Sequence, residues 1–160
     1  MNKQNVHQLL LEQLAIDFDV AQRAAQTAYE TATHEENIAE NKYDTLGLEA
    51  SYLAAGQARR VEEIRQALTL CQNMSLGAYD PQQGIQIGSL LGLEDDQGRQ
   101  QWLFLAPDAA GLKVYLVGQL ITVITPRSPL GNSLRGKFEG DEVEIVVAGT
   151  RQQFTVTEVV

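Results

Sequence analysis

The sequence is poor in the residues that disulfides, histidine metal sites and catalytic triads require. Cys71 is its only cysteine among 160 residues, and His7 and His34 are its only histidines. A single thiol excludes an intramolecular disulfide and fits the reducing cytosol. Because both histidines precede residue 85, neither a Ser-His-Asp triad nor a histidine zinc site can form in the second half of the chain.

Positive charge and long apolar runs are also scarce. Twelve lysines and arginines stand against 21 aspartates and glutamates, which leaves a net charge of −9. Nucleic-acid phosphates or an anionic membrane would be repelled, so a basic surface or a metal ion is the better partner. The longest apolar run, 114–123, is broken by Gly118 and Gln119, and residues 1–8 are polar. We therefore predict a cytoplasmic protein without a signal peptide or membrane span.

The first half of the chain shows two helical stripes. Residues 4–34 contain neither proline nor glycine, and apolar residues recur there at steps of three and four. The first stripe is Leu10, Leu14, Phe18, Ala21, Ala25, Ala28 and Ala32; the second is Leu46, Ala50, Ala54, Gln57, Val61, Ile64, Leu68 and Cys71. Each stripe has small residues at one end and large residues at the other, in mirrored order. This predicts an antiparallel coiled-coil hairpin over residues 1–75, with alanines facing alanines.

The predicted turn of this hairpin, near Glu36 to Lys42, lies in a strongly acidic segment (residues 29–49). It holds six carboxylates and one base, hence five of the nine net negative charges. Carboxylates held this close repel one another, and a tip that projects into water relieves the repulsion. The same geometry can carry carboxylates into the cleft of another molecule.

Two glycines, Gly47 and Gly56, interrupt the second helical stripe. Each costs about 1 kcal/mol relative to alanine in a helix. One interpretation is that they permit close approach of the two helices, and the other is flexibility near the tip. We favour close approach.

Composition changes after Asn73, and the hydrophobic period becomes two. Residues 76–84 are rich in Gly and Pro and predict a linker, with the domain boundary near Asp80. Residues 85–160 predict a small β-rich domain of five or six strands. The expected strands are 85–93, 101–106, 113–116, 120–125, 142–147 and 152–159. A short helix is capped by Ser128, has Pro129 in its first turn and ends at Gly136, so the fold class is α+β.

Other motifs in this half carry little chemistry. Gly84, Gly88 and Gly92 are spaced by four, but no helix follows them as a phosphate loop requires. The run 94–96, Glu-Asp-Asp, has cation-binding oxygens, although such runs in hairpin turns are usually only solvated. Cys71 lies on the helical stripe and is expected in the core.

Two motifs resemble the bacterial GreA/GreB transcript cleavage factors. Residues 124–137, Ile-Thr-Pro-Arg-Ser-Pro-Leu-Gly-Asn-Ser-Leu-Arg-Gly-Lys, and 140–145, Gly-Asp-Glu-Val-Glu-Ile, are similar to that family's carboxy-terminal signature. Glu40-Asn41 followed by Tyr43 resembles part of its tip motif. The resemblance covers essentially the whole chain, and it implies a helical hairpin followed by an FKBP-like domain.

The resemblance implies a monomeric accessory factor of RNA polymerase rather than an enzyme. Such factors insert the hairpin into the polymerase's secondary channel and help hold a second Mg²⁺ at its active site, where backtracked RNA is cleaved. It implies no cofactor of the protein's own beyond this shared Mg²⁺. The tip carboxylates Glu40, Glu36 and Asp44 would act there, and Glu40 and Glu36 would share the ion, since Mg²⁺ prefers oxygen ligands and needs few carboxylates.

The sequence departs from the family at one tip position. Where the family has Asp-Leu-Lys-Glu-Asn, this chain has Asn37-Ile-Ala-Glu40-Asn, so an amide replaces the first carboxylate. Glu36 and Asp44, each four residues from Glu40, could substitute for it. A channel-binding regulator or inhibitor without cleavage stimulation therefore stays open as an alternative.

Two hypotheses come from other classes of protein. A dimerising coiled-coil adaptor would need a second apolar face at 9–14 and 68–70. A peptidyl-prolyl isomerase would need an aromatic-lined pocket, and its candidate aromatics are scattered over several elements. These are Trp102, Phe104, Tyr115, Phe138 and Phe154.

Overall fold

The computed structural model describes residues 1–34 and 45–160. Contacts divide the chain into two compact units. One holds Met1–Glu12 and Thr69–Val160, and the other holds Gln13–Leu68. Among the described residues, no helix is both long and apolar enough to cross a membrane.

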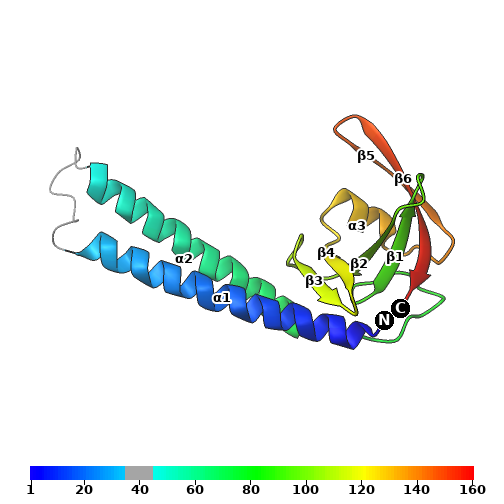
Figure 1. Ribbon diagram of the computed structural model, residues 1–160, viewed down its shortest axis with the longest axis horizontal. Helices are drawn as coiled ribbons and strands as arrows, with labels where there is room; N and C mark the ends of the chain where they lie inside the picture. Colours follow the sequence, from blue (N-terminus) through cyan, green and yellow to red (C-terminus); the bar gives the residue numbers. More distant parts are fainter. Residues whose placement is uncertain (35–44) are drawn as a thin grey trace. The chain divides into compact units, whose positions relative to one another are not determined.

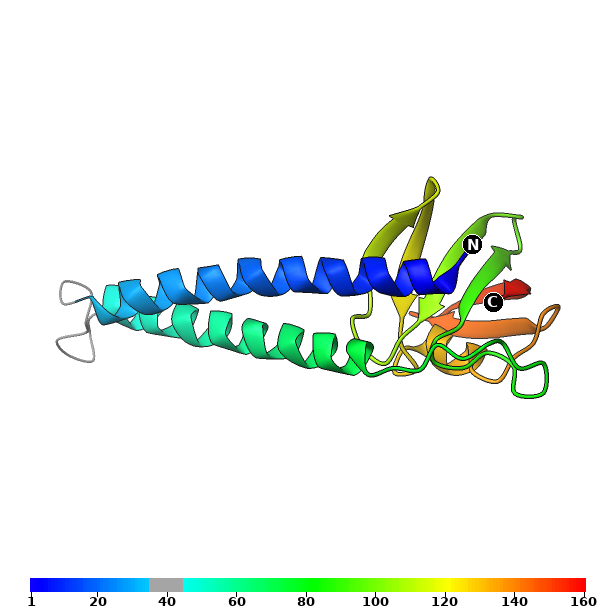
Figure 2. The ribbon, with the colours of Figure 1, turned by 90° about the horizontal axis from the view of Figure 1, so that it is seen from below.

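The first half forms the two long helices that the stripes predict. Helix α1 spans Lys3–Thr33 and α2 spans Thr45–Gln72, and the two lie side by side in both ribbon views (Figures 1 and 2). At 1.5 Å per residue, the 31 residues of α1 extend for about 46 Å. Every residue of the first stripe is buried or half-buried, which confirms the predicted face of α1.

Burial along the helices follows the predicted gradient of side-chain size. Leu10 and Leu14 are 0% and 4% exposed at one end of the stripe, and Ala21 and Ala28 continue the buried row toward the other end. On α2, Ile64 is buried, whereas Ala54 and Val61 are half-buried. Because alanine buries little area, this row is held with less hydrophobic free energy at its alanine end than at its leucine end.

Gly56 does not serve close approach of the helices, so that interpretation is wrong at this position. A Cβ built on Gly56 meets no heavy atom within 4 Å. Gly56→Ala is therefore expected to stabilise α2 by about 1 kcal/mol, because alanine has the higher helix propensity and no neighbour must move. Circular dichroism at the helical band during thermal melting measures the effect. A lower melting temperature than wild type would contradict it.

The second half folds into one six-stranded sheet and one short helix. With the two long helices, this confirms the predicted α+β fold class. The strands are β1 (Leu90–Asp95), β2 (Gln100–Leu105), β3 (Lys113–Leu116), β4 (Gln119–Ile124), β5 (Glu142–Val147) and β6 (Thr150–Val159). Their order is β3-β4-β2-β1-β6-β5. Only β2 and β4 pair in parallel; the other neighbours are antiparallel. Helix α3 spans Pro129–Leu134 and contacts β5.

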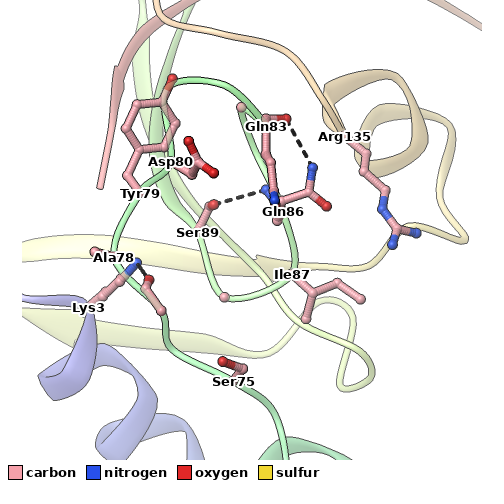
Figure 3. Close-up of a pocket in the computed structure, with 13 residues that line it drawn as sticks. Lys3, Ser75, Ala78, Tyr79, Asp80, Gln83, Gln86, Ile87, Ser89 and Arg135 are labelled. Carbon is pink, nitrogen blue, oxygen red and sulfur yellow. Dashed lines mark hydrogen bonds between the residues drawn. The ribbon is translucent and has the colours of Figure 1, made fainter.

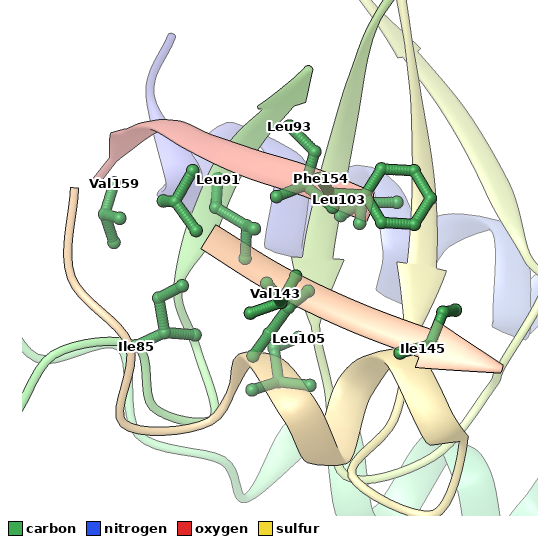
Figure 4. Close-up of a cluster of buried hydrophobic side chains, with 11 residues drawn as sticks. Ile85, Leu91, Leu93, Leu103, Leu105, Val143, Ile145, Phe154 and Val159 are labelled. Atoms are coloured by element: carbon green, nitrogen blue, oxygen red, sulfur yellow. The ribbon is translucent and has the colours of Figure 1, made fainter. Parts of the chain in front are cut away.

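Side chains on one face of this sheet form the core cluster. Leu91 and Leu93 of β1 lie with Leu103 and Leu105 of β2, and Leu134 of α3 closes the cluster. Figure 4 shows strand side chains of β1, β2, β5 and β6 converging on this interior. Side chains alternate along a strand, so Phe104 and the other in-between residues point to the opposite face.

The first predicted strand is wrong in its position. The alternation at 85–93 predicted a strand there, but β1 begins only at Leu90. The side chain of Ile85 enters the core from a loop. Its backbone N–H donates a hydrogen bond to the Lys137 carbonyl oxygen at 2.8 Å. Gly84 and Gly88 adopt positive φ angles of 73° and 99°, which breaks an extended strand before it can pair.

Candidate functional site

The predicted tip carboxylates lie outside the described residues. Glu36, Asn37, Glu40 and Asp44 all fall between residue 34, where the first described range ends, and residue 45, where the next begins. Their role as catalytic or Mg²⁺-binding groups stays a prediction. The helical arms on either side of them are described.

Both helices present exposed carboxylates near residues 35–44 of the sequence. Glu30 on α1 and Glu49 on α2 are exposed, and Glu30 accepts a hydrogen bond from Gln26 Nε2 at 3.0 Å. Neither carboxylate forms an ion pair with another described residue. The acidic charge of the segment therefore continues onto both helices without local neutralisation.

Hydroxyl side chains on both arms bond to the helix backbone. Thr31 Oγ1 donates to the Thr27 carbonyl at 3.0 Å and Thr33 Oγ1 to that of Tyr29 at 2.9 Å. On α2, Ser51 Oγ donates to the Gly47 carbonyl at 3.0 Å. These bonds satisfy the hydroxyl groups within the helix, at a slight cost in helix stability, because each shares a carbonyl of the preceding turn.

The alanine ends of the helices leave a shallow groove between them. A hollow of about 340 Å³ is lined by Ala24, Thr27, Ala28, Thr31, Ala50, Leu53 and Gln57. Ala28 and Ala50 line it together, as the mirrored stripes predict. Leu53, which is 58% exposed, lies at its edge.

Within the unit Met1–Glu12 and Thr69–Val160, hydrogen bonds join the ends of α1 and α2 to each other and to a loop of the sheet. His7 Nε2 lies 2.7 Å from the Cys71 carbonyl oxygen and so joins the two helices. Cys71 Sγ donates to the Asp108 carbonyl at 3.9 Å, in the loop between β2 and β3. Asp108 in turn pairs with Arg127 at 3.3 Å. Asp108 was not predicted from the sequence, although Pro107-Asp108 is a turn signal.

Cys71 is core, as predicted, and is expected to be chemically inert. Its side chain is fully buried, and this burial raises the pKa of its thiol to about 11. Thiolate is the reactive form, so alkylation near pH 8 should be slower than for a free thiol by roughly 100-fold or more. Mass spectrometry should find Cys71 unlabelled in the native protein and fully labelled after unfolding.

A second thiol provides the control for this experiment. Ala110 is exposed in the same unit, so the cysteine of Ala110→Cys should react at the free rate. Equal labelling of both thiols in the folded protein would show that Cys71 is accessible.

The motif around Ser128 has a clear structural basis. Ser128 Oγ caps α3 by accepting from Gly131 N at 3.0 Å, and it donates to the Thr125 carbonyl at 3.0 Å. A Cβ on Gly131 would lie 2.0 Å from the Thr125 carbonyl oxygen. The predicted cap and first-turn proline are confirmed, and Gly136, at φ 81°, follows the cap residue Arg135 at the end of α3. The tight turn explains why glycine is needed at position 131.

The acidic turn at 94–96 is used for structure. Asp95 Oδ1 accepts from the backbone of Gln97 and Arg99 at 2.9 Å each, and Arg99 Nε donates to Asp95 Oδ2 at 2.7 Å. These bonds, chiefly from the Arg99 backbone N–H, lower the pKa of the Asp95 carboxyl. Within residues 1–34 and 45–160, no group of three metal-ligating side chains comes together.

The candidate aromatic residues do not gather as an isomerase site requires. Phe104 is fully buried, Phe154 is in the core cluster and Tyr115 is 70% exposed. The cavity near the end of α3 is lined by none of the five. The structure thus offers no support for peptidyl-prolyl isomerisation.

Comparisons with known proteins find likeness only among solved structures. No family model and no characterised protein sequence matches the chain. The structure of GreA factor homolog 1 (Gfh1) of Thermus thermophilus matches at 18% identity and TM-score 0.39, over 94% of each chain. The structure of Thermus aquaticus Gfh1 matches at 21% sequence identity and a TM-score of 0.38, over 92% of each chain. The structure of the transcription elongation factor GreA/GreB from Nitrosomonas europaea matches at 19% sequence identity and a TM-score of 0.38. The match covers 60% of this chain and 78% of that chain.

These names are those of the family that the sequence motifs resemble. The identities and TM-scores are too low to assign a function to the chain.

Proposed function

We propose that the protein binds RNA polymerase and inserts its acidic segment into the secondary channel, where it stimulates Mg²⁺-dependent cleavage of backtracked RNA. The observation that carries this is the pairing of two long helices around a short, acid-rich connection. Residues 35–44 contain four carboxylates and one lysine, and the helices that flank them are 31 and 28 residues long. The motif resemblance at 124–137 supports the same function.

The chemistry requires little of the protein beyond well-placed oxygens. Glu40 and Glu36 would supply carboxylate ligands, and Mg²⁺ binds through one or two carboxylates while it keeps several waters. When bound, such an ion lowers the pKa of a coordinated water and stabilises a leaving oxygen. The protein would thus act as an accessory factor, with the reaction in the polymerase active site.

A regulator that occupies the channel without stimulating cleavage is the second candidate. The observation in its favour is Asn37, which offers a neutral oxygen where the resembled family has a carboxylate. One fewer charged ligand weakens Mg²⁺ binding. Such a protein would slow transcript extension and release no cleavage product.

Burial at the leucine end of the helices argues against the dimerising adaptor. Leu10 and Leu14 are nearly inaccessible, Leu9 and Leu68 are half-buried, and only Leu70 is largely exposed, at 47%. A stable interface needs a contiguous apolar patch, which these residues do not form. This supports the proposal that the protein acts as a monomer.

A backtracked elongation complex tests the proposed function directly. The purified protein is added to polymerase stalled on end-labelled RNA with Mg²⁺, and the RNA is resolved on a gel. Shortened RNA that then resumes extension supports cleavage stimulation. Slower extension without shortened RNA supports the regulator, and no effect together with no binding to polymerase would contradict both.

A further inference from the structure

A cavity in the sheet unit lies beside the first turn of α1. Its volume is about 300 Å³, within the range of small-molecule sites. It is bounded by Lys3, by the loop that leads into β1 and by Arg135 after α3. Figure 3 shows Lys3 beside Ala78 on one side of the loop that carries Gln86 and Ser89, and Arg135 on the other side with its guanidinium group directed away from the loop.

Lys3, at the edge of this cavity, is a buried lysine without an ion-pair partner among the described residues. The residue is only 5% exposed, and its Nζ donates a hydrogen bond to the Gly77 carbonyl. An ammonium group has three N–H donors, and Lys3 has no ion pair with any residue of 1–34 or 45–160. Burial lowers the pKa of Lys3, as expected when a charge loses water without gaining a counter-charge.

The helix itself makes this position less favourable for a cation. Lys3 is the first residue of α1, and the first turn contains no acidic residue. The amino end of a helix carries partial positive charge, which repels cations and attracts anions. A negative group in the cavity would therefore relieve two unfavourable interactions together.

A second buried donor faces the same cavity. Ser89 is 5% exposed, and its Oγ accepts a hydrogen bond from Gln86 N at 3.0 Å. No described residue accepts the hydroxyl proton of Ser89 in return. On the rim, exposed Arg135 adds positive charge, while exposed Asp80 uses Oδ1 to accept from Gln82 N at 2.9 Å.

We propose that this cavity binds the oxyanion group of a small molecule, a phosphate or a carboxylate, through Lys3 and Ser89. The two free N–H groups of Lys3 and the hydroxyl of Ser89 would donate to the oxyanion. Asp80 repels negative charge, so the rest of the ligand toward that residue would be neutral or a hydrogen-bond donor. This inference is independent of the proposed action on polymerase.

Nuclear magnetic resonance of the intact ¹⁵N-labelled protein tests the proposal. Inorganic phosphate and succinate are titrated separately, each against sodium chloride of equal ionic strength. We expect saturable shifts at the amides of Gly77, Gly88 and Ser89 with at least one of the two. Saturable shifts with phosphate but not succinate would identify the oxyanion as a phosphate, and the reverse result would identify it as a carboxylate. Shifts that do not saturate, or that chloride reproduces, would overturn the proposal.

Variants then test the role assigned to Lys3. Lys3→Met keeps the buried aliphatic stem and should weaken binding on the order of 10-fold or more, the value of a charge-assisted hydrogen bond. Lys113→Met removes the same charge from exposed β3 and should bind like wild type. Equal affinity in Lys3→Met and wild type would overturn the proposal. If Lys3→Met does not fold, the wild-type titration and Arg135→Gln, expected to bind more weakly, decide it.

Discussion

Gly131→Ala is expected to destabilise the sheet unit by about 3 kcal/mol, at the upper end of typical overpacking effects. The new Cβ would lie 2.0 Å from the Thr125 carbonyl oxygen. That oxygen belongs to the backbone and also accepts the Ser128 hydroxyl bond, so no side-chain rotation relieves the clash. The melting temperature should fall by roughly 6–12 °C.

Trp102 gives the measurement a natural reporter. It is the only tryptophan, and it lies in β2, so its fluorescence follows unfolding of the sheet unit. Asn132→Ala, at the exposed neighbour in α3, is the matched control and should melt close to wild type. If Gly131→Ala melted like Asn132→Ala, the close contact with Thr125 would be wrong.

Glu40→Ala is expected to abolish cleavage stimulation while the affinity for polymerase stays nearly unchanged. The proposed role of Glu40 is to supply an oxygen ligand to a shared Mg²⁺, and alanine supplies none. Cleavage of backtracked RNA and binding to polymerase are measured side by side. Glu49→Ala removes the same charge from exposed α2 and should keep activity. An equal loss of binding in Glu40→Ala would make this residue a docking contact instead.

Asn37→Asp is expected to increase cleavage stimulation, because it restores a carboxylate at the position where this chain has an amide. The same backtracked complex measures the rate. An unchanged rate would indicate that Glu36 already supplies the carboxylate that position 37 lacks. Adding Glu36→Ala to the Asn37→Asp variant separates these two contributions.

Local sequence signals predicted much of the fold. The steps of three and four from Leu10 to Ala32 identified the buried face of α1, because a helix repeats every 3.6 residues. Ser128, followed by Pro129, identified the start of α3 through its capping chemistry. Both signals depend only on neighbours within a few residues.

Features set by tertiary contacts were not predictable in the same way. The alternation that begins at Ile85 resembled a strand, but the backbone there pairs with Lys137 and not with a neighbouring strand. The burial of Lys3 depends on residues more than seventy positions away. At the candidate site, the sequence indicated carboxylates at the tip, and their arrangement falls outside the described residues.

The change from leucine to alanine along α1 and α2 has a consequence for motion. Opening free energies within one protein vary with the apolar area that each segment buries. The turns near Ala28 and Ala50 are therefore expected to separate at lower cost than those near Leu10 and Cys71, where larger side chains are fully buried. The paired helices are therefore expected to be more compliant at their alanine end than at their leucine end.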